Sequence, residues 1–74
     1  MIEIRYRETL TPGAVSAFIV EANGRVIGEV RQLGPGAVSP GTWQAQPAAG
    51  RLVGGFRKRS DAVACLVDEI GGFE

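Results

Sequence analysis

Histidine is missing from this sequence, and cysteine occurs once, as Cys65. Without histidine, the chain lacks the commonest general base and the commonest metal ligand. A single cysteine can neither close a disulfide within the chain nor supply a thiolate metal site by itself, so Cys65 is expected to be a small flank or core residue. We therefore expect no metal, no cofactor and an intracellular setting.

Long hydrophobic runs are also missing. No stretch reaches the roughly 18 consecutive apolar residues that a transmembrane helix needs. The start, MIEIRYRE, does not have the basic and then apolar pattern of a secretory signal. These absences predict a cytoplasmic protein that does not bind a membrane.

Net charge is absent as well, because eight Lys and Arg balance eight Asp and Glu. No global field attracts phosphate or anionic lipid, so any affinity for nucleic acid must come from a local patch. The 74 residues are expected to form one domain, residues 1–74, with little room for the buried pocket in which paired carboxylates do acid–base chemistry. We predict a protein that is not an enzyme and has no small-molecule substrate.

Three short segments outside the central hairpin also predict strands. MIEIRYRE places Ile2, Ile4 and Tyr6 on one side, which is typical of a strand with one solvated face. TWQAQPA, residues 42–48, predicts a short strand that lies at an edge or ends at Pro47, since proline cannot donate a ladder hydrogen bond. RLVGGF, residues 51–56, predicts another short strand after a turn.

Asn23-Gly24 is the strongest local signal, because this dipeptide between two β-branched runs is the preferred turn of a type I′ hairpin. The pairs expected across this hairpin are Ala22 with Arg25, Val20 with Ile27, and Phe18 with Glu29. Both sides of the hairpin are then largely apolar. Either the hairpin is central and covered on both sides, or it offers one side to a partner.

A C-terminal helix is predicted after Ser60, a suitable N-cap, with Asp61 favourable at the positive end of the helix dipole. Its apolar stripe comprises Val63, Leu66, Val67 and Ile70, and Gly71 and Gly72 end the helix. The predicted fold class is α+β: a small antiparallel sheet of four to five strands packed on one C-terminal amphipathic helix.

Basic residues offer the main candidate chemistry. Arg57, Lys58 and Arg59 come just before the predicted helix, where backbone amides favour a phosphate. Arginine and glutamine on a sheet can make bidentate contacts to base edges, with Arg25, Arg31, Trp43 and Gln44 as the candidates. The alternative is that strand arginines only solubilise a face and protect an edge.

Several short motifs between residues 28 and 67 carry a resemblance. These are Val30-Arg31-Gln32, Trp43-x-Ala45, Arg51, Gly55-Phe56 and Ser60-Asp61-Ala62. Together they resemble the AP2-type DNA-binding domains and their relatives in phage integrases and homing endonucleases. The resemblance implies a three-stranded antiparallel sheet on one helix, with the sheet in the major groove. It implies DNA contact by Arg25, Arg31, Trp43 and Arg51, and scaffold roles for Phe56, Ala62 and Leu66.

Two functions remain open from the sequence. The first is a noncatalytic protein-interaction module, either a homodimer or an inhibitor or regulator of a larger protein, in the setting of a phage or mobile element. Its expected partner-binding residues are Phe18, Val20, Ile27 and Trp43. The second is an accessory protein that binds double-stranded DNA. Its expected contacts are Arg25, Arg31, Trp43, Gln44, Arg51, Arg57, Lys58 and Arg59.

Overall fold

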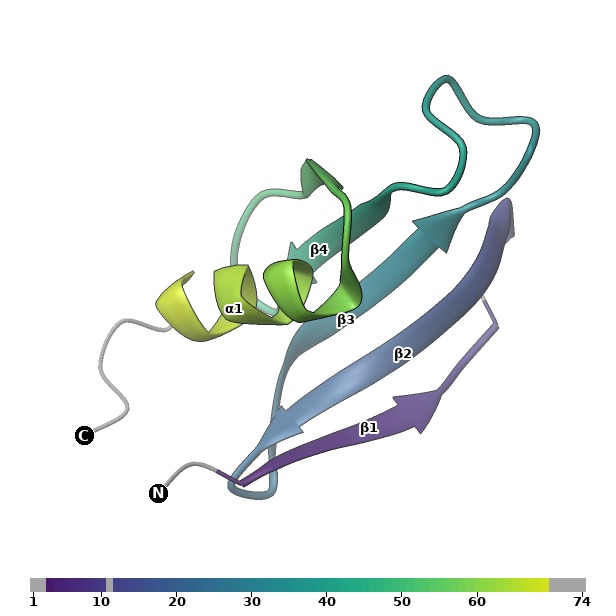
Figure 1. Ribbon diagram of the computed structural model, residues 1–74. Coiled ribbons are helices and arrows are strands. Elements are labelled where there is room, and N and C mark those ends of the chain that lie inside the picture. Colours follow the sequence, from purple (N-terminus) through teal and green to yellow (C-terminus); the bar gives the residue numbers. More distant parts are fainter. Residues whose placement is uncertain (1–2, 11, 70–74) are drawn as a thin grey trace.

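A computed structural model describes residues 3–10 and 12–69 of the chain. These residues form five strands and one helix: β1 (Ile4–Glu8), β2 (Ala14–Ala22), β3 (Arg25–Leu33), β4 (Trp43–Pro47), β5 (Val53–Phe56) and α1 (Arg59–Glu69). The strands form one antiparallel meander in the order β1-β2-β3-β4-β5 (Figure 1). The predicted α+β class, an antiparallel sheet followed by a C-terminal helix, is confirmed.

The hairpin between β2 and β3 turns where the sequence predicts. Asn23 and Gly24 have φ values of 52° and 81°, as a type I′ turn requires, and Ala22 lies opposite Arg25. Beyond this first pair, the predicted register is wrong. A β-bulge at Ile27 shifts the ladder, so that the observed pairs are Glu21 with Val26, Val20 with Gly28, and Phe18 with Val30.

The bulge decides which residues of β3 face the helix. Gly28 and Val30 now lie on the same side as Val20, whereas the expected register would put them on the opposite side. A Cβ atom on Gly28 would overlap the carbonyl oxygen of Gln46 and lie 2.7 Å from Leu66 Cδ2. The bulge therefore places Gly28, which has no side chain, where α1 packs closely against β3.

The helix begins two residues earlier than predicted, at Arg59 rather than Asp61. The Lys58 carbonyl accepts hydrogen bonds from the amides of Asp61, at 3.2 Å, and Ala62, at 3.3 Å. Ser60 is therefore in the first turn and is not the N-cap, which is a correction to the sequence prediction. Ile70, Gly71 and Gly72, predicted to complete the stripe and end the helix, lie outside the described residues.

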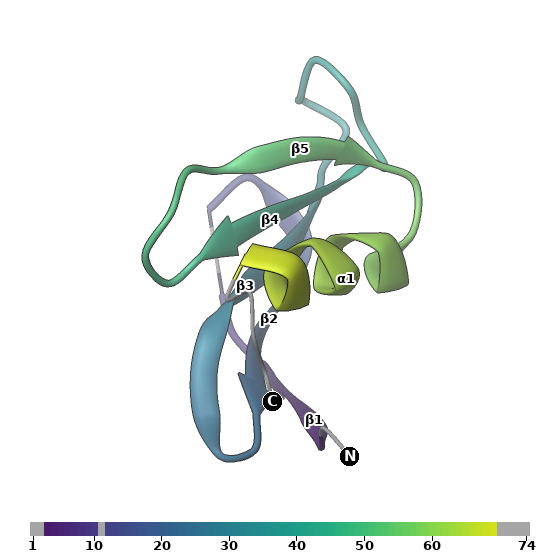
Figure 2. The same ribbon diagram turned by 90° about the vertical axis from the view of Figure 1, so that its left-hand side faces the viewer.

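The core lies between α1 and one face of the sheet. Its buried residues are Val20, Ala22, Ile27, Val30, Ala45, Ala62, Val63 and Leu66. The helix packs against β3, β4 and β5, and Figure 1 shows β1 and β2 extending beyond it. Figure 2 shows the same helix lying beside β5 and in front of β4. Within the described residues, α1 therefore covers the helix-side face over β3, β4 and β5 and leaves the part at β1 open.

Candidate interaction site

The strand pairing sorts the side chains onto two faces, because directly opposite residues in an antiparallel sheet share a face. The face turned away from α1 is lined by Arg5, Arg7, Ala17, Ile19, Glu21, Val26, Glu29, Arg31, Gln44 and Gln46. No element of the described chain, residues 3–10 and 12–69, covers this face. We call it the uncovered face.

Arginines on the uncovered face are matched by glutamates. Arg5 Nε lies 3.0 Å from Glu3 Oε1, Arg7 Nη2 lies 3.7 Å from Glu21 Oε2, and Arg31 Nη2 lies 3.4 Å from Glu29 Oε1. These pairs are partly or largely exposed, so each contributes little to stability. Their consequence is electrostatic: a phosphate approaching any of these arginines also meets a carboxylate.

Arg31 is held close to the sheet. Its side chain is 23% exposed, and its Nε atom is buried without a hydrogen-bond partner in the described part of the chain. Gln44, its neighbour across β3 and β4, lies with its amide group close to Gly54. The two residues predicted to contact bases on this face therefore lie against other residues of this chain, Arg31 beside Glu29 and Gln44 beside Gly54.

An aromatic strip crosses the part of the helix-side face that α1 leaves open. The rings of Tyr6 and Phe18 meet edge to face, with centroids 6.3 Å apart, and the rings of Phe18 and Trp43 stack at 6.4 Å. Phe18 and Trp43 are partly buried against the core, whereas Tyr6 is 44% exposed. We call these three residues the aromatic strip.

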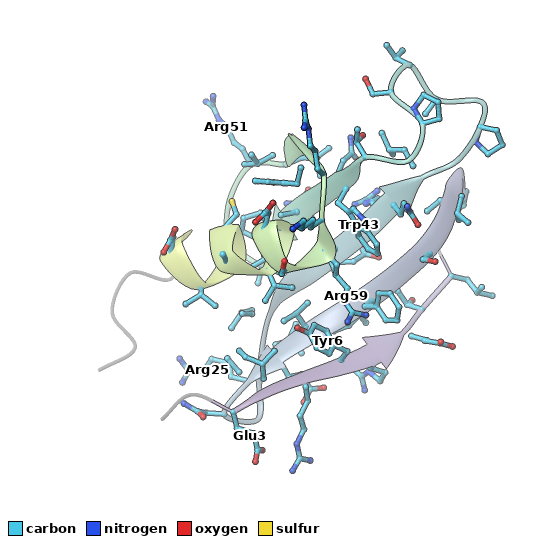
Figure 3. The ribbon with its side chains drawn as sticks, viewed as in Figure 1. Glu3, Tyr6, Arg25, Trp43, Arg51 and Arg59 are labelled. Carbon is cyan, nitrogen blue, oxygen red and sulfur yellow. The ribbon has the colours of Figure 1, made fainter. Side chains whose placement is uncertain are left out.

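Arg59 reaches from the first turn of α1 across this strip. Its Cζ atom lies 4.7 Å from the centroid of the Tyr6 ring and 5.2 Å from that of Phe18, both within cation–π range. Figure 3 shows the Arg59 side chain directed toward Tyr6, with Trp43 on the same side of the sheet. A guanidinium that stacks on rings keeps its N–H edge available for an oxygen ligand.

The aromatic strip ends at β1, which is an edge strand of the described sheet. The Glu3 carbonyl accepts a hydrogen bond from the Asn23 amide at 2.9 Å, and the Thr9 amide donates to the Ala17 carbonyl at 3.0 Å. Because bonding direction alternates along a strand, the odd-numbered residues of β1 face β2. The N–H and C=O groups of Ile4, Tyr6 and Glu8 therefore point outward from the sheet.

The predicted protein-binding residues do not form one surface. Val20 is 0% exposed and Ile27 is 2% exposed, so both belong to the core of this chain and are not presented to a partner. The other two residues of that set, Phe18 and Trp43, lie side by side in the aromatic strip. The sequence did not single out Tyr6 or the position of Arg59 above it, because these residues are brought together only by the packing of α1.

The predicted DNA contacts are also divided. Arg31 and Gln44 are on the uncovered face, whereas Trp43 is on the helix side. The bulge at Ile27 puts Arg25 on the opposite side from Arg31. Figure 3 shows Arg25 at the turn of the hairpin and Arg51 beyond β5, both apart from Arg59. Arg57, Lys58 and Arg59 stay together where α1 begins, and all are exposed.

Metal and membrane sites find no support in the described residues. No cluster of three or more His, Cys, Asp and Glu side chains within residues 3–10 and 12–69 could hold a metal ion. The helix found in this part of the chain does not have the length and apolar character needed to cross a bilayer. Cys65 is partly buried on α1, packed against the core.

Comparison with protein-family models, with curated proteins and with solved structures found no match for this chain. The resemblance to AP2-type domains is therefore limited to the general plan of an antiparallel sheet packed on a helix. Here that sheet has five strands, where the resemblance implies three.

Proposed function

We propose that this chain is a noncatalytic protein-interaction module that binds another protein through the edge of β1 and the adjoining aromatic strip. The observation that carries the proposal is the position of Tyr6. Its side chain is 44% exposed at the end of the aromatic strip, and its backbone lies on the edge strand. An edge strand with outward-pointing backbone groups and a neighbouring surface for side chains is a common site for binding an extended segment.

Charge supports a protein partner over nucleic acid. Eight cationic and eight anionic residues leave the chain neutral, and the arginines of the uncovered face are each matched by a glutamate. A phosphate backbone is bound mainly by surplus positive charge. The chain is thus better suited to a partner that brings shape and backbone hydrogen bonds, as a regulator of a larger protein or as a homodimer.

DNA binding is the second candidate, and one observation favours it. Arg57 and Lys58 are exposed at the beginning of α1, and neither forms an ion pair with a carboxylate of the described residues. With Arg59 they could contact phosphates, as the sequence predicts. This cluster is small, and Trp43, one of the residues expected to contact bases, is partly buried.

The test of the proposed function is selection from an unbiased random peptide library displayed on phage. We expect wild-type protein to enrich peptides that the Tyr6→Lys variant does not retain, because lysine on an edge strand blocks strand addition. The Val38→Lys variant is the matched control, since Val38 is fully exposed in the loop between β3 and β4. Circular dichroism checks that both variants fold. Equal enrichment by Tyr6→Lys would reject the β1 edge as the binding site.

Light scattering across a range of protein concentrations completes the test. A rise in molar mass that Tyr6→Lys abolishes identifies a second copy of the chain as the partner. A mass that stays monomeric, together with no enriched peptide, would contradict the proposal.

A further inference from the structure

We infer that the partner segment at β1 is acidic and that Arg59 binds one of its carboxylates, an inference that rests on the proposed function. The arginines of the uncovered face carry a glutamate partner, as Arg5, Arg7 and Arg31 show. Arg59 differs, because its described contacts are aromatic rings, and no described carboxylate lies within ion-pair distance of it.

The rings fix the guanidinium beside the edge of the sheet. Arg59 lies above Tyr6, whose backbone groups point outward from β1. Neighbouring strands are about 4.8 Å apart, so a strand added to β1 would place a side chain directly beside the Tyr6 ring. An Asp or Glu at that position could reach Arg59 with both carboxylate oxygens, in the bidentate geometry that arginine favours.

Local charge also favours an acidic segment. Arg57 and Lys58 precede Arg59 and are exposed, and Asp61 follows in the first turn of α1. Glu8 is on the same side of β1, opposite Phe18, whose ring also lies under Arg59. Around the beginning of α1, the three cations Arg57, Lys58 and Arg59 therefore exceed the two carboxylates of Glu8 and Asp61 by one, and this small surplus favours an acidic segment over a basic one.

The deciding experiment sequences the peptides enriched on the wild-type chain and measures their affinities by fluorescence anisotropy. We expect Asp or Glu in the enriched peptides, and replacement of that residue by Asn or Gln should weaken binding. The Arg59→Gln substitution should lower the affinity for the acidic peptides about tenfold or more, because it removes a charge-assisted hydrogen bond. Arg51→Gln is the matched control, since it removes the same charge from an exposed position before β5 and should leave the affinity unchanged.

The outcomes separate this inference from the proposed function. The inference of an acidic segment would be rejected if the enriched peptides require Tyr6 but contain no acidic residue. It would also be rejected if they bind the Arg59→Gln variant as tightly as wild type. Either result would leave the proposed interaction module in place. An equal loss with Arg51→Gln would reduce the role of Arg59 to general charge and also overturn the inference. If no peptide is enriched, both the acidic segment and the interaction module at β1 are contradicted. Amide shifts at Ile4, Tyr6 and Glu8 in a titration followed by NMR would locate the added strand.

Discussion

At the scale of single residues, Gly28 has the greatest influence on the fold. It lies opposite Val20 in the shifted ladder and directly beneath Leu66 of α1, whose side chain is 0% exposed. Any side chain at this position would hold α1 away from β3. The close packing of helix on sheet, and with it the position of Arg59 above Tyr6, therefore depends on a residue that has no chemistry of its own.

Replacing Gly28 by alanine should destabilise the protein by about 2 kcal/mol or more, since a methyl group must be fitted into a packed core. Urea denaturation measures the loss. Gly36→Ala is the control, because no heavy atom lies within 4 Å of the Cβ that it would add, and its midpoint should stay near that of wild type. Equal midpoints for the two variants would show that α1 does not pack on Gly28.

At the scale of elements, the hairpin turn also anchors the edge strand. Asn23 has a φ of 52°, and its Oδ1 atom accepts a hydrogen bond from the Glu3 amide at 2.9 Å. The backbone amide of Asn23 donates a hydrogen bond to the Glu3 carbonyl, also at 2.9 Å. The same residue thus forms the turn between β2 and β3 and holds the beginning of β1 in place.

Asn23→Ala should cost about 1–2 kcal/mol, because alanine tolerates positive φ poorly and cannot accept the hydrogen bond. Asn23→Asp keeps both the acceptor and much of the conformational tolerance, so its loss should be smaller. Hydrogen exchange checks the mechanism: the Glu3 amide should lose protection in Asn23→Ala and retain it in Asn23→Asp. Unchanged protection in both variants would show that the side chain does not anchor β1.

The elements themselves could be predicted because their signals are local. Alternation identifies the strands, Asn23-Gly24 identifies the turn, and the apolar stripe identifies the helix. The bulge at Ile27 could not be predicted, because no local signal marks it and the packing that accompanies it joins Gly28 to Leu66, which is far away in the sequence. Because the register is shifted, Arg25 and Arg31 lie on opposite faces of the sheet. The residues predicted to contact DNA therefore do not form one surface.

At the scale of the whole molecule, the distribution of charge determines which class of large partner the chain is suited to bind. The chain is neutral overall, and the arginines of the uncovered face lie beside glutamates. The cations of the described chain that cluster without such partners are Arg57, Lys58 and Arg59, at one end of α1. The described residues therefore form a small positive region beside the aromatic strip, and among them no positive face is large enough to follow a duplex.

Duplex DNA should consequently bind weakly, with a dissociation constant no tighter than the roughly 10⁻⁶ M of nonspecific complexes at physiological salt. Fluorescence anisotropy with a labelled duplex pool between about 0.05 and 0.2 M salt gives both the affinity and its salt dependence. If Arg57, Lys58 and Arg59 make the contacts, the slope of log K against log salt should be about −3. Submicromolar binding with a slope beyond about −5 would require more cations than this cluster provides. The arginines of the uncovered face would then have to leave their glutamates for phosphate, and DNA binding would replace the protein-interaction module as the better account of this chain.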